Sequence, residues 1–168
     1  CTTQGPIDST TITFKPGLHC YVNTNSPARI TFSPGLHIIQ GTMNIASNST
    51  IIANGVTFYF PDTNSGLRGN GGITFTGAAP TSGPYAGILM FEKTSNATNN
   101  ANKQQYIFNG GKSESYEGTI SLPNRDLVFN STTQIDAKLS LVANSMIIHT
   151  ANWTLAPYSG GSSGGSGV

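Results

Sequence analysis

The chain has 168 residues, the length of one domain, and only 9% of them are charged, with a formal net charge of +1. Typical globular proteins carry about 25% charged residues. The absence of a Lys/Arg cluster excludes the electrostatic footprint of a nucleic-acid-binding protein, so we expect no nucleic acid partner. No run of 18 or more apolar residues is present, so we expect no membrane segment in this chain and a soluble domain.

An eight-residue phrase occurs twice near the beginning of the chain. Residues 12–19 read ITFKPGLH and residues 30–37 read ITFSPGLH, 18 residues apart, and the shorter echo apolar-Thr-Phe returns at residues 56–58 and 73–75. The apolar-polar alternation predicts short half-buried strands, and Pro-Gly predicts a turn after each of the first two. Such short units must stack to share a core. The sequence therefore predicts an all-β, single-stranded parallel β-helix (β-solenoid) with coils of roughly 17–26 residues and loop excursions.

The only two cysteines lie close to one coil apart. Cys1 belongs to a polar lead-in, residues 1–11, and Cys20 follows the first phrase. Adjacent parallel strands lie about 4.8 Å apart, a separation that a disulfide can span. We expect a Cys1–Cys20 disulfide that clips one end of the solenoid, and with it an oxidising compartment such as the periplasm or the cell surface.

Strand patterns continue to about residue 148. The phrase Ile120-Ser121-Leu122 returns in residues 139–141 at an offset of 19 residues, again about one coil. We expect residues 1–158 to form the solenoid and residues 159–168 to be a Gly/Ser-rich flexible tail or linker. Residues 61–72 are predicted to be a turn-rich excursion, and residues 86–92 a central strand buried on both faces. The remaining expected strands are residues 43–45, 50–52, 56–60, 73–76, 106–108, 118–122, 126–130, 139–142 and 146–148.

The segment 94–105, TSNATNNANKQQ, has no hydrophobic period and almost no apolar residues. We expect it to leave the coil as a loop, and loops of this length are usually functional or disordered. It is the candidate interaction loop, with the candidate contact residues Thr94, Asn96, Asn99, Asn100, Asn102, Lys103, Gln104 and Gln105.

No constellation typical of catalysis is visible. Glu114 and Glu117 are three residues apart, which in an extended strand puts them on opposite faces, so they do not form an acid/base pair. His19 and His37 occupy the same place in successive coils and are expected to stack, but two imidazoles fall short of the three or four ligands of a metal site. We therefore expect no enzyme, no catalytic or metal-binding residues and no cofactor.

Several phrases together resemble one bacterial family. The phrases ITF at residues 73–75, PTSGPYAGILMF at 80–91, NGG at 109–111 and EGTISLPN at 117–124 are similar to the C-terminal region of TadG-like proteins, putative assembly proteins of the Flp/Tad tight-adherence pilus. The resemblance implies a non-enzymatic, exported domain at the periplasmic face of the inner membrane or on the cell surface. It also implies pilus or pilus-assembly proteins as partners, and an N-terminal membrane anchor in the full-length protein that this chain lacks.

Two other binding functions remain open. A surface-binding or ice-binding-like module would present Thr13, Thr31, Thr57 and Thr74 as one column, although only the coil with Thr76 completes a Thr-x-Thr pair. A carbohydrate-binding adhesin would use exposed aromatic residues. The candidate aromatic residues are Tyr21, Tyr85, Tyr116 and Trp153, and Trp153 is also expected to close the C-terminal end of the solenoid together with Leu155 and Tyr158.

Overall fold

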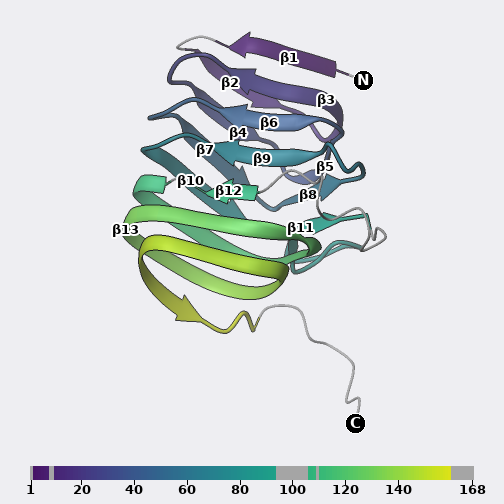
Figure 1. Cartoon of the computed structure of the whole chain (residues 1–168). Helices are drawn as coiled ribbons and strands as arrows, with labels where there is room; N and C mark the ends of the chain where they lie inside the picture. The colour runs from purple at the N-terminus through teal and green to yellow at the C-terminus, as the bar shows by residue number, and fades with distance from the viewer. Residues whose placement is uncertain (1, 8–9, 94–105, 109, 160–168) are drawn as a thin grey trace.

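The computed structural model describes residues 2–7, 10–93, 106–108 and 110–159. In these residues the secondary structure is entirely β, and thirteen strands join into one sheet whose neighbouring strands run parallel. Figure 1 shows the strands as a stack of coils, with β1 at one end and the last turns of β13 at the other. The predicted β-solenoid is confirmed. Its strands are β1 (Thr2–Ile7), β2 (Thr11–Phe14), β3 (Gly17–Thr24), β4 (Arg29–Phe32), β5 (Gly35–Ile39), β6 (Thr42–Ile45), β7 (Thr50–Asn54), β8 (Val56–Phe60), β9 (Gly66–Gly69), β10 (Ile73–Ala78), β11 (Ile88–Glu92), β12 (Tyr106–Phe108) and β13 (Gly110–Ala156).

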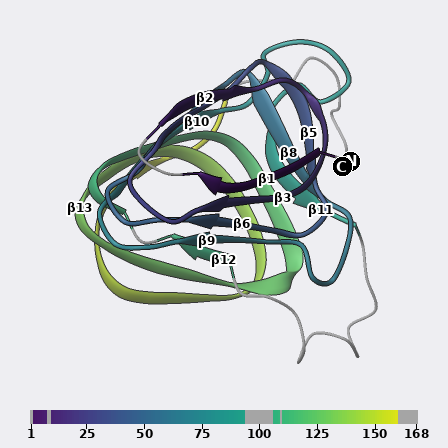
Figure 2. The ribbon, with the colours of Figure 1, turned by 90° about the horizontal axis from the view of Figure 1, so that it is seen from above.

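Seen along its axis, the solenoid has three sides (Figure 2). The first side stacks β2, β4, β7 and β10, the second stacks β5, β8 and β11, and the third stacks β6, β9 and β12. The strand β3 turns a corner, because it pairs with β5 at its beginning and with β6 near its end. The long strand β13 contributes to all three sides, and β1 lies on β3 at the N-terminal end.

The core follows from the alternation along each strand. On the first side Ile12, Ile30, Ile51 and Phe75 stand in one column, and the last three are at most 1% exposed. The residues before and after each of these in its strand face outward and are mostly Thr. In every coil, every second side chain of a strand is therefore buried away from water, and the apolar columns form one core along the axis.

The Pro-Gly turns stack as well. A Cβ built on Gly35 would lie 2.7 Å from Cγ of Pro16, and one built on Gly55 would lie 3.4 Å from Cβ of Pro34. The proline of one coil therefore packs on the glycine of the next. Gly17, Gly35 and Gly118 have φ of 140°, 132° and 134°, values that side chains disfavour, so these positions require glycine.

The structure corrects four details of the expected strand plan. The lead-in contains β1, which pairs with β3, and the excursion after Pro61 contains β9. The separate strands expected after residue 110 are one strand, β13, that continues around the corners. The strand β11 is not buried on both faces, because Ile88 and Phe91 are half-exposed. Within the described residues no helix is long and apolar enough to cross a membrane.

Two glycines allow the effect of close packing to be separated from the effect of backbone strain. Gly17 and Gly118 share nearly the same φ, but a Cβ on Gly17 would meet nothing within 4 Å. A Cβ on Gly118 would lie 2.7 Å from Cβ of Ala79 and 3.3 Å from the Gly87 carbonyl oxygen. We expect Gly17→Ala to destabilise the protein by about 1 kcal/mol through strain and Gly118→Ala by about 3 kcal/mol or more. Urea unfolding measures both, and equal losses would contradict the packing at this corner.

Candidate functional site

The corner between the second and third sides contains a buried ion pair. Glu92 ends β11, and its Oε2 accepts a 2.8 Å hydrogen bond from Nε of Arg125, with both side chains 2% exposed. The Oε1 atom accepts a second bond of 2.8 Å from the backbone N–H of Asn124. Glu92 stands opposite Phe60 in the register, so the carboxylate occupies a core-facing position. Both of its oxygens are engaged, as a buried carboxylate requires.

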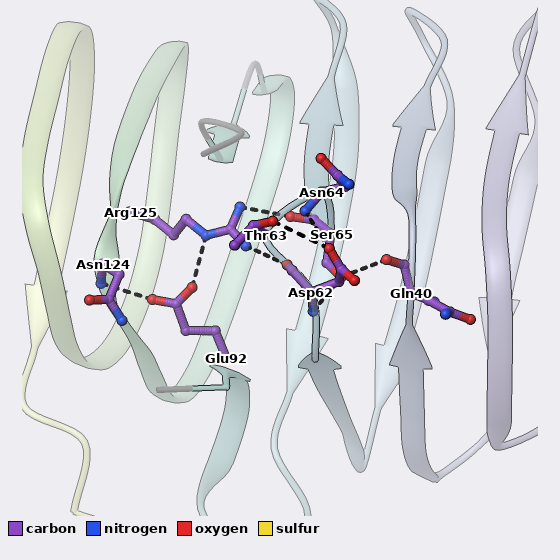
Figure 3. A network of polar contacts seen from close by, with 8 residues as sticks. All are labelled: Gln40, Asp62, Thr63, Asn64, Ser65, Glu92, Asn124 and Arg125. Carbon is purple, nitrogen blue, oxygen red and sulfur yellow. Dashed lines mark hydrogen bonds and ion pairs between the residues drawn. The ribbon is translucent and has the colours of Figure 1, made fainter. Parts of the chain in front are cut away.

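Arg125 also reaches past the coil of β11. Its Nη1 donates to the carbonyl oxygen of Ser65 at 2.7 Å, and its Nη2 donates to that of Asp62 at 2.8 Å. Both carbonyls belong to the turn between β8 and β9, one coil further from β13 than β11 is. The guanidinium therefore joins coils that are not neighbours and supplies hydrogen-bond donors at this corner (Figure 3).

The turn that receives Arg125 is itself ordered by hydrogen bonds. Oδ1 of Asp62 accepts the N–H of Asn64 at 3.0 Å, and Oγ of Ser65 accepts the N–H of Asp62 at 3.0 Å. Ser65 Oγ in turn donates to the carbonyl of Gln40, one coil further, at 2.7 Å. One polar network thus connects four successive corners, from Gln40 to Arg125 (Figure 3). We call Gln40, Asp62, Ser65, Glu92 and Arg125 the corner network.

The corner network contains Glu92, which lies two residues before the candidate interaction loop in the sequence. Lys93 follows Glu92 directly, and its N–H donates to the carbonyl of Phe60 at 3.0 Å. After residue 105 the next described strand is β12, whose Ile107 pairs with Arg68 and Val128. The candidate contact residues between Thr94 and Gln105 lie outside the described residues.

The two histidines stack as the repeat predicts, but they are buried. The ring centroids of His19 and His37 lie 5.2 Å apart at an interplanar angle of 9°, and the rings pack against Phe14 and Phe32. Nε2 of His37 lies 2.8 Å from the Ser33 carbonyl, which can only accept, so His37 carries its proton on Nε2. Its Nδ1 then accepts from Nε2 of His19 at 3.0 Å. In the described residues no group of three or more potential ligands surrounds a metal position.

The predicted disulfide remains a prediction, because Cys1 lies outside the described residues. The register of β1 supports the pairing. Thr2, which follows Cys1 in the sequence, pairs with His19, which precedes Cys20.

The threonine column differs from the expected one. Thr13 and Thr31 are in register, but Thr57 lies buried on the second side, where its Oγ1 donates to the carbonyl of Ile88 at 2.7 Å. Thr74 belongs to a different column from Thr13, because the coils differ in length. The first side has two outward columns, one of Thr11, Arg29, Thr50 and Thr74, and one of Thr13, Thr31, Ile52, Thr76 and Ser115.

The acidic residues of the SESYEG phrase point to opposite faces, as predicted. Glu114 is buried opposite Phe75 in the register, whereas Glu117 is exposed. The Tyr116 hydroxyl donates to Oε1 of Glu114 at 2.7 Å, and burial, together with the nearby carboxylate, raises the Tyr116 pKa well above its usual value. Tyr116 is therefore a core residue, and the expectation that it is exposed is wrong.

The aromatic side chains of the second side cover one another. Phe91 stacks on Tyr59 with centroids 4.5 Å apart and on Tyr85 at 5.9 Å. A sugar ring stacks on a free aromatic face. The rings of Tyr59 and Tyr85 already stack on Phe91, so its faces are not free for a sugar. Tyr21, by contrast, is 40% exposed. Tyr85 also lines a cleft of about 400 Å³ below the 80–87 turn, together with Pro34, Pro80 and Pro84.

Comparison of the chain with models of protein families, with curated proteins and with solved structures finds no match.

The corner network was not predicted from the sequence, although one signal was present. Glu92 is two residues after the buried Met90, at a position where the strand alternation demands an inward side chain. A carboxylate there requires a buried cation or donors, and Arg125 lies 33 residues further along the chain. The coil repeat of the sequence does not predict that these two residues meet, because the 94–105 segment interrupts the repeat between them.

We predict that Arg125→Met destabilises the domain by about 3–5 kcal/mol, because Glu92 then remains buried without its cation. The double variant Glu92→Met/Arg125→Met is expected to recover part of this loss, since no charge remains. Urea unfolding measures the free energies. The control is Arg68→Met, whose side chain is exposed on β9. A loss for Arg125→Met no larger than for Arg68→Met would show that the pair does not hold this corner.

We further predict that stability falls as the pH decreases below 6.5. Burial lowers the pKa of His19 and His37 from 6.5, and the neighbouring His37 lowers that of His19 further. The native state therefore binds fewer protons than the unfolded chain, so the stabilisation is complete above pH 6.5 and is lost toward the lower folded pKa values. Replacing both residues by Phe is expected to flatten this slope in unfolding curves between pH 7 and pH 5. If the free energy of unfolding of the double variant still falls as steeply between pH 7 and pH 5, groups other than His19 and His37 cause the pH dependence.

Proposed function

We propose that the domain is a non-enzymatic, exported part of a Flp/Tad pilus-assembly protein, and that it works by binding a pilus or pilus-assembly protein. The phrases quoted above support the family, and the corner network supports the mode of action. A chain with 9% charged residues places a fully buried ion pair at the base of its long polar loop. We regard this placement as the observation that carries the proposal.

Burying an ion pair costs desolvation free energy. A buried salt bridge is often no more stabilising than apolar side chains of the same volume, so stability alone is a weak reason for it. Unlike apolar packing, the guanidinium of Arg125 also holds two backbone carbonyls of another coil at defined positions through directional hydrogen bonds. Residues 94–105 therefore follow a fixed point of the stack in the sequence, and fixing the attachment point of a binding segment removes part of the freedom that binding would otherwise cost.

The chemistry of the loop fits a protein partner. Residues 94–105 carry amide and hydroxyl side chains and a single charge, Lys103. Such side chains offer donors and acceptors for hydrogen bonds at an interface without a strong electrostatic preference. The buried carboxylates Glu92 and Glu114 are hydrogen-bonded inside the stack, so neither is presented to a substrate.

A second candidate, a surface-binding module, is favoured by the register of the first side. Two adjacent outward columns carry mostly Thr and Ser, with neighbours about 4.8 Å apart across the strands and about 6.6 Å apart along them. The expected column contained one complete Thr-x-Thr pair, whereas the observed columns contain Thr11-x-Thr13 and Thr74-x-Thr76. A flat hydroxyl-bearing face of this kind suits a repetitive polar surface.

One pull-down separates the two candidates. The domain, a variant lacking residues 94–105, and the variant Thr31→Lys/Thr76→Lys are each used to capture material from a lysate and from a sheared surface fraction of the source cells. We expect pilin or pilus-machinery proteins with the intact domain, at least tenfold less with the loop deletion, and unchanged capture with the lysine variant.

The converse pattern identifies the second candidate. Recovery of polysaccharide that is lost only with the lysine variant would replace the pilus proposal by the surface-binding one. Capture of pilus proteins that does not depend on the loop would overturn the role of residues 94–105. Thr31 and Thr76 are half-buried at outward-facing positions of the first side, and circular dichroism checks that each variant retains its β structure.

A further inference from the structure

The corner between β7 and β8 carries an exposed Asn-Gly pair. Asn54 is the last residue of β7 and is exposed, and Gly55, which joins the two strands, has a φ of 69°. The residues on either side of the pair, Ala53 and Val56, are both 0% exposed. The pair therefore presents an accessible carboxamide at a corner that is anchored in the core on each side.

An asparagine that precedes a glycine can react with its own main chain. The backbone nitrogen of the glycine attacks Cγ of the asparagine and forms a five-membered succinimide ring. The bond between Cγ and Nδ2 breaks, and Nδ2 leaves as ammonia with the proton of the attacking nitrogen. Glycine favours this step because no Cβ shields its nitrogen.

Water then opens the succinimide ring at one of its two carbonyl carbons. Opening at Cγ leaves an ordinary aspartate in an unchanged main chain. Opening at the main-chain carbonyl leaves a β-aspartyl link, in which the main chain runs through Cγ and is one carbon longer. Both products carry a carboxylate where the asparagine carried a neutral amide, and the sequence of steps consumes only water.

The surroundings of Asn54 leave its carboxamide accessible for this reaction. In the part of the chain that the structure describes, no hydrogen bond holds the Asn54 side chain. The main chain is paired on one edge only, since β4 pairs with β7 as far as Ile52, whereas β10 continues to Asn54. The pair of Asn54 with Ala78 is the last of that ladder, and the end of a ladder opens more readily than its middle.

A second Asn-Gly pair, residues 70–71, provides an internal comparison. Asn70 is half-buried, and its Nδ2 donates a 2.9 Å hydrogen bond to the carbonyl oxygen of Ile45. The Asn70 N–H donates to the same oxygen, also at 2.9 Å. Since Nδ2 is the leaving group, ring closure at Asn70 has to break a bond that Asn54 lacks. The asparagine of a third pair, Asn109, lies outside the described residues.

We propose that Asn54 is a site of spontaneous deamidation and isomerisation, at which the folded domain acquires an aspartyl or β-aspartyl residue as it ages. Each event lowers the formal net charge, which is +1 for the unmodified chain, by one. The proposal rests on the exposed corner and not on the pilus function. A failure to capture pilus proteins and a failure to deamidate can therefore be told apart.

The two products are expected to differ in their effect on the fold. The carbonyl of Gly55 accepts the N–H of Gly35 at 2.9 Å, and a Cβ built on Gly55 would lie 3.4 Å from Cβ of Pro34. An additional main-chain carbon before Gly55 has to fit between the buried side chains of Ala53 and Val56, so the β-aspartyl form loses these contacts. The aspartyl form keeps the length of the main chain and changes only an exposed side chain.

Peptide mapping of the full chain during incubation at pH 8 tests the site. Trypsin cleaves after Arg29, Arg68 and Lys93, which places Asn54 and Asn70 in different peptides, and fragment spectra locate the changed residue. We expect Asn54 to convert at least fivefold faster than Asn70 in the folded protein, and the two rates to converge in urea. The matched control is Asn54→Gln, which would need a less favourable six-membered ring and should abolish conversion at this position.

Conversion of Asn54 in the folded protein that is no faster than that of Asn70 would overturn the proposal. A second measurement tests the structural consequence. Urea unfolding compares the purified β-aspartyl form with the Asn54→Asp variant, which has the same charge and the ordinary main-chain length. We expect a lower midpoint for the β-aspartyl form, and equal midpoints would show that the corner accepts the additional carbon without losing its contacts.

Discussion

The whole structure depends on the parallel hydrogen-bond ladder that joins each coil to the next. The ladder fixes neighbouring strands at about 4.8 Å, so a residue within a strand lies directly above or below a residue of the next coil. Columns of Ile and Phe can share a core under this constraint, and columns of Thr or Asn can hydrogen-bond, as Asn44 does with Asn23 at 3.1 Å. Columns of like charges would repel, which accounts for the low charge of the sequence.

Different contacts stabilise the different corners of the solenoid. At the corner between the first and second sides, a proline packs on the glycine of the next coil. At the corner between the second and third sides, Arg125 bonds carbonyls beyond the neighbouring coil. The fully buried ion pair described here includes Glu92, which lies two residues before the polar segment 94–105 in the sequence. This coincidence connects the fold to the proposed binding role.

Repetition made the architecture predictable. The recurring Ile-Thr-Phe phrases and Pro-Gly turns indicated strands, turns and stacking, and the ring pair of His19 and His37 followed from their shared place in the repeat. The alignment of later coils was not predictable, because turns of different length shift the register, so Thr57 lies on a different side from Thr31. The partnership of Glu92 and Arg125 depends on contacts between coils, which no local pattern encodes.

The central claim is that the buried guanidinium of Arg125 holds three successive corners of the solenoid together, and hydrogen–deuterium exchange of the Arg125→Met variant tests it most directly. The account predicts faster exchange of the amides of Asp62, Asn64, Ser65, Lys93 and Asn124, with little change in β2 and β4, which contribute no residue to the corner network. Faster exchange spread evenly over all coils, or none at this corner, would contradict it.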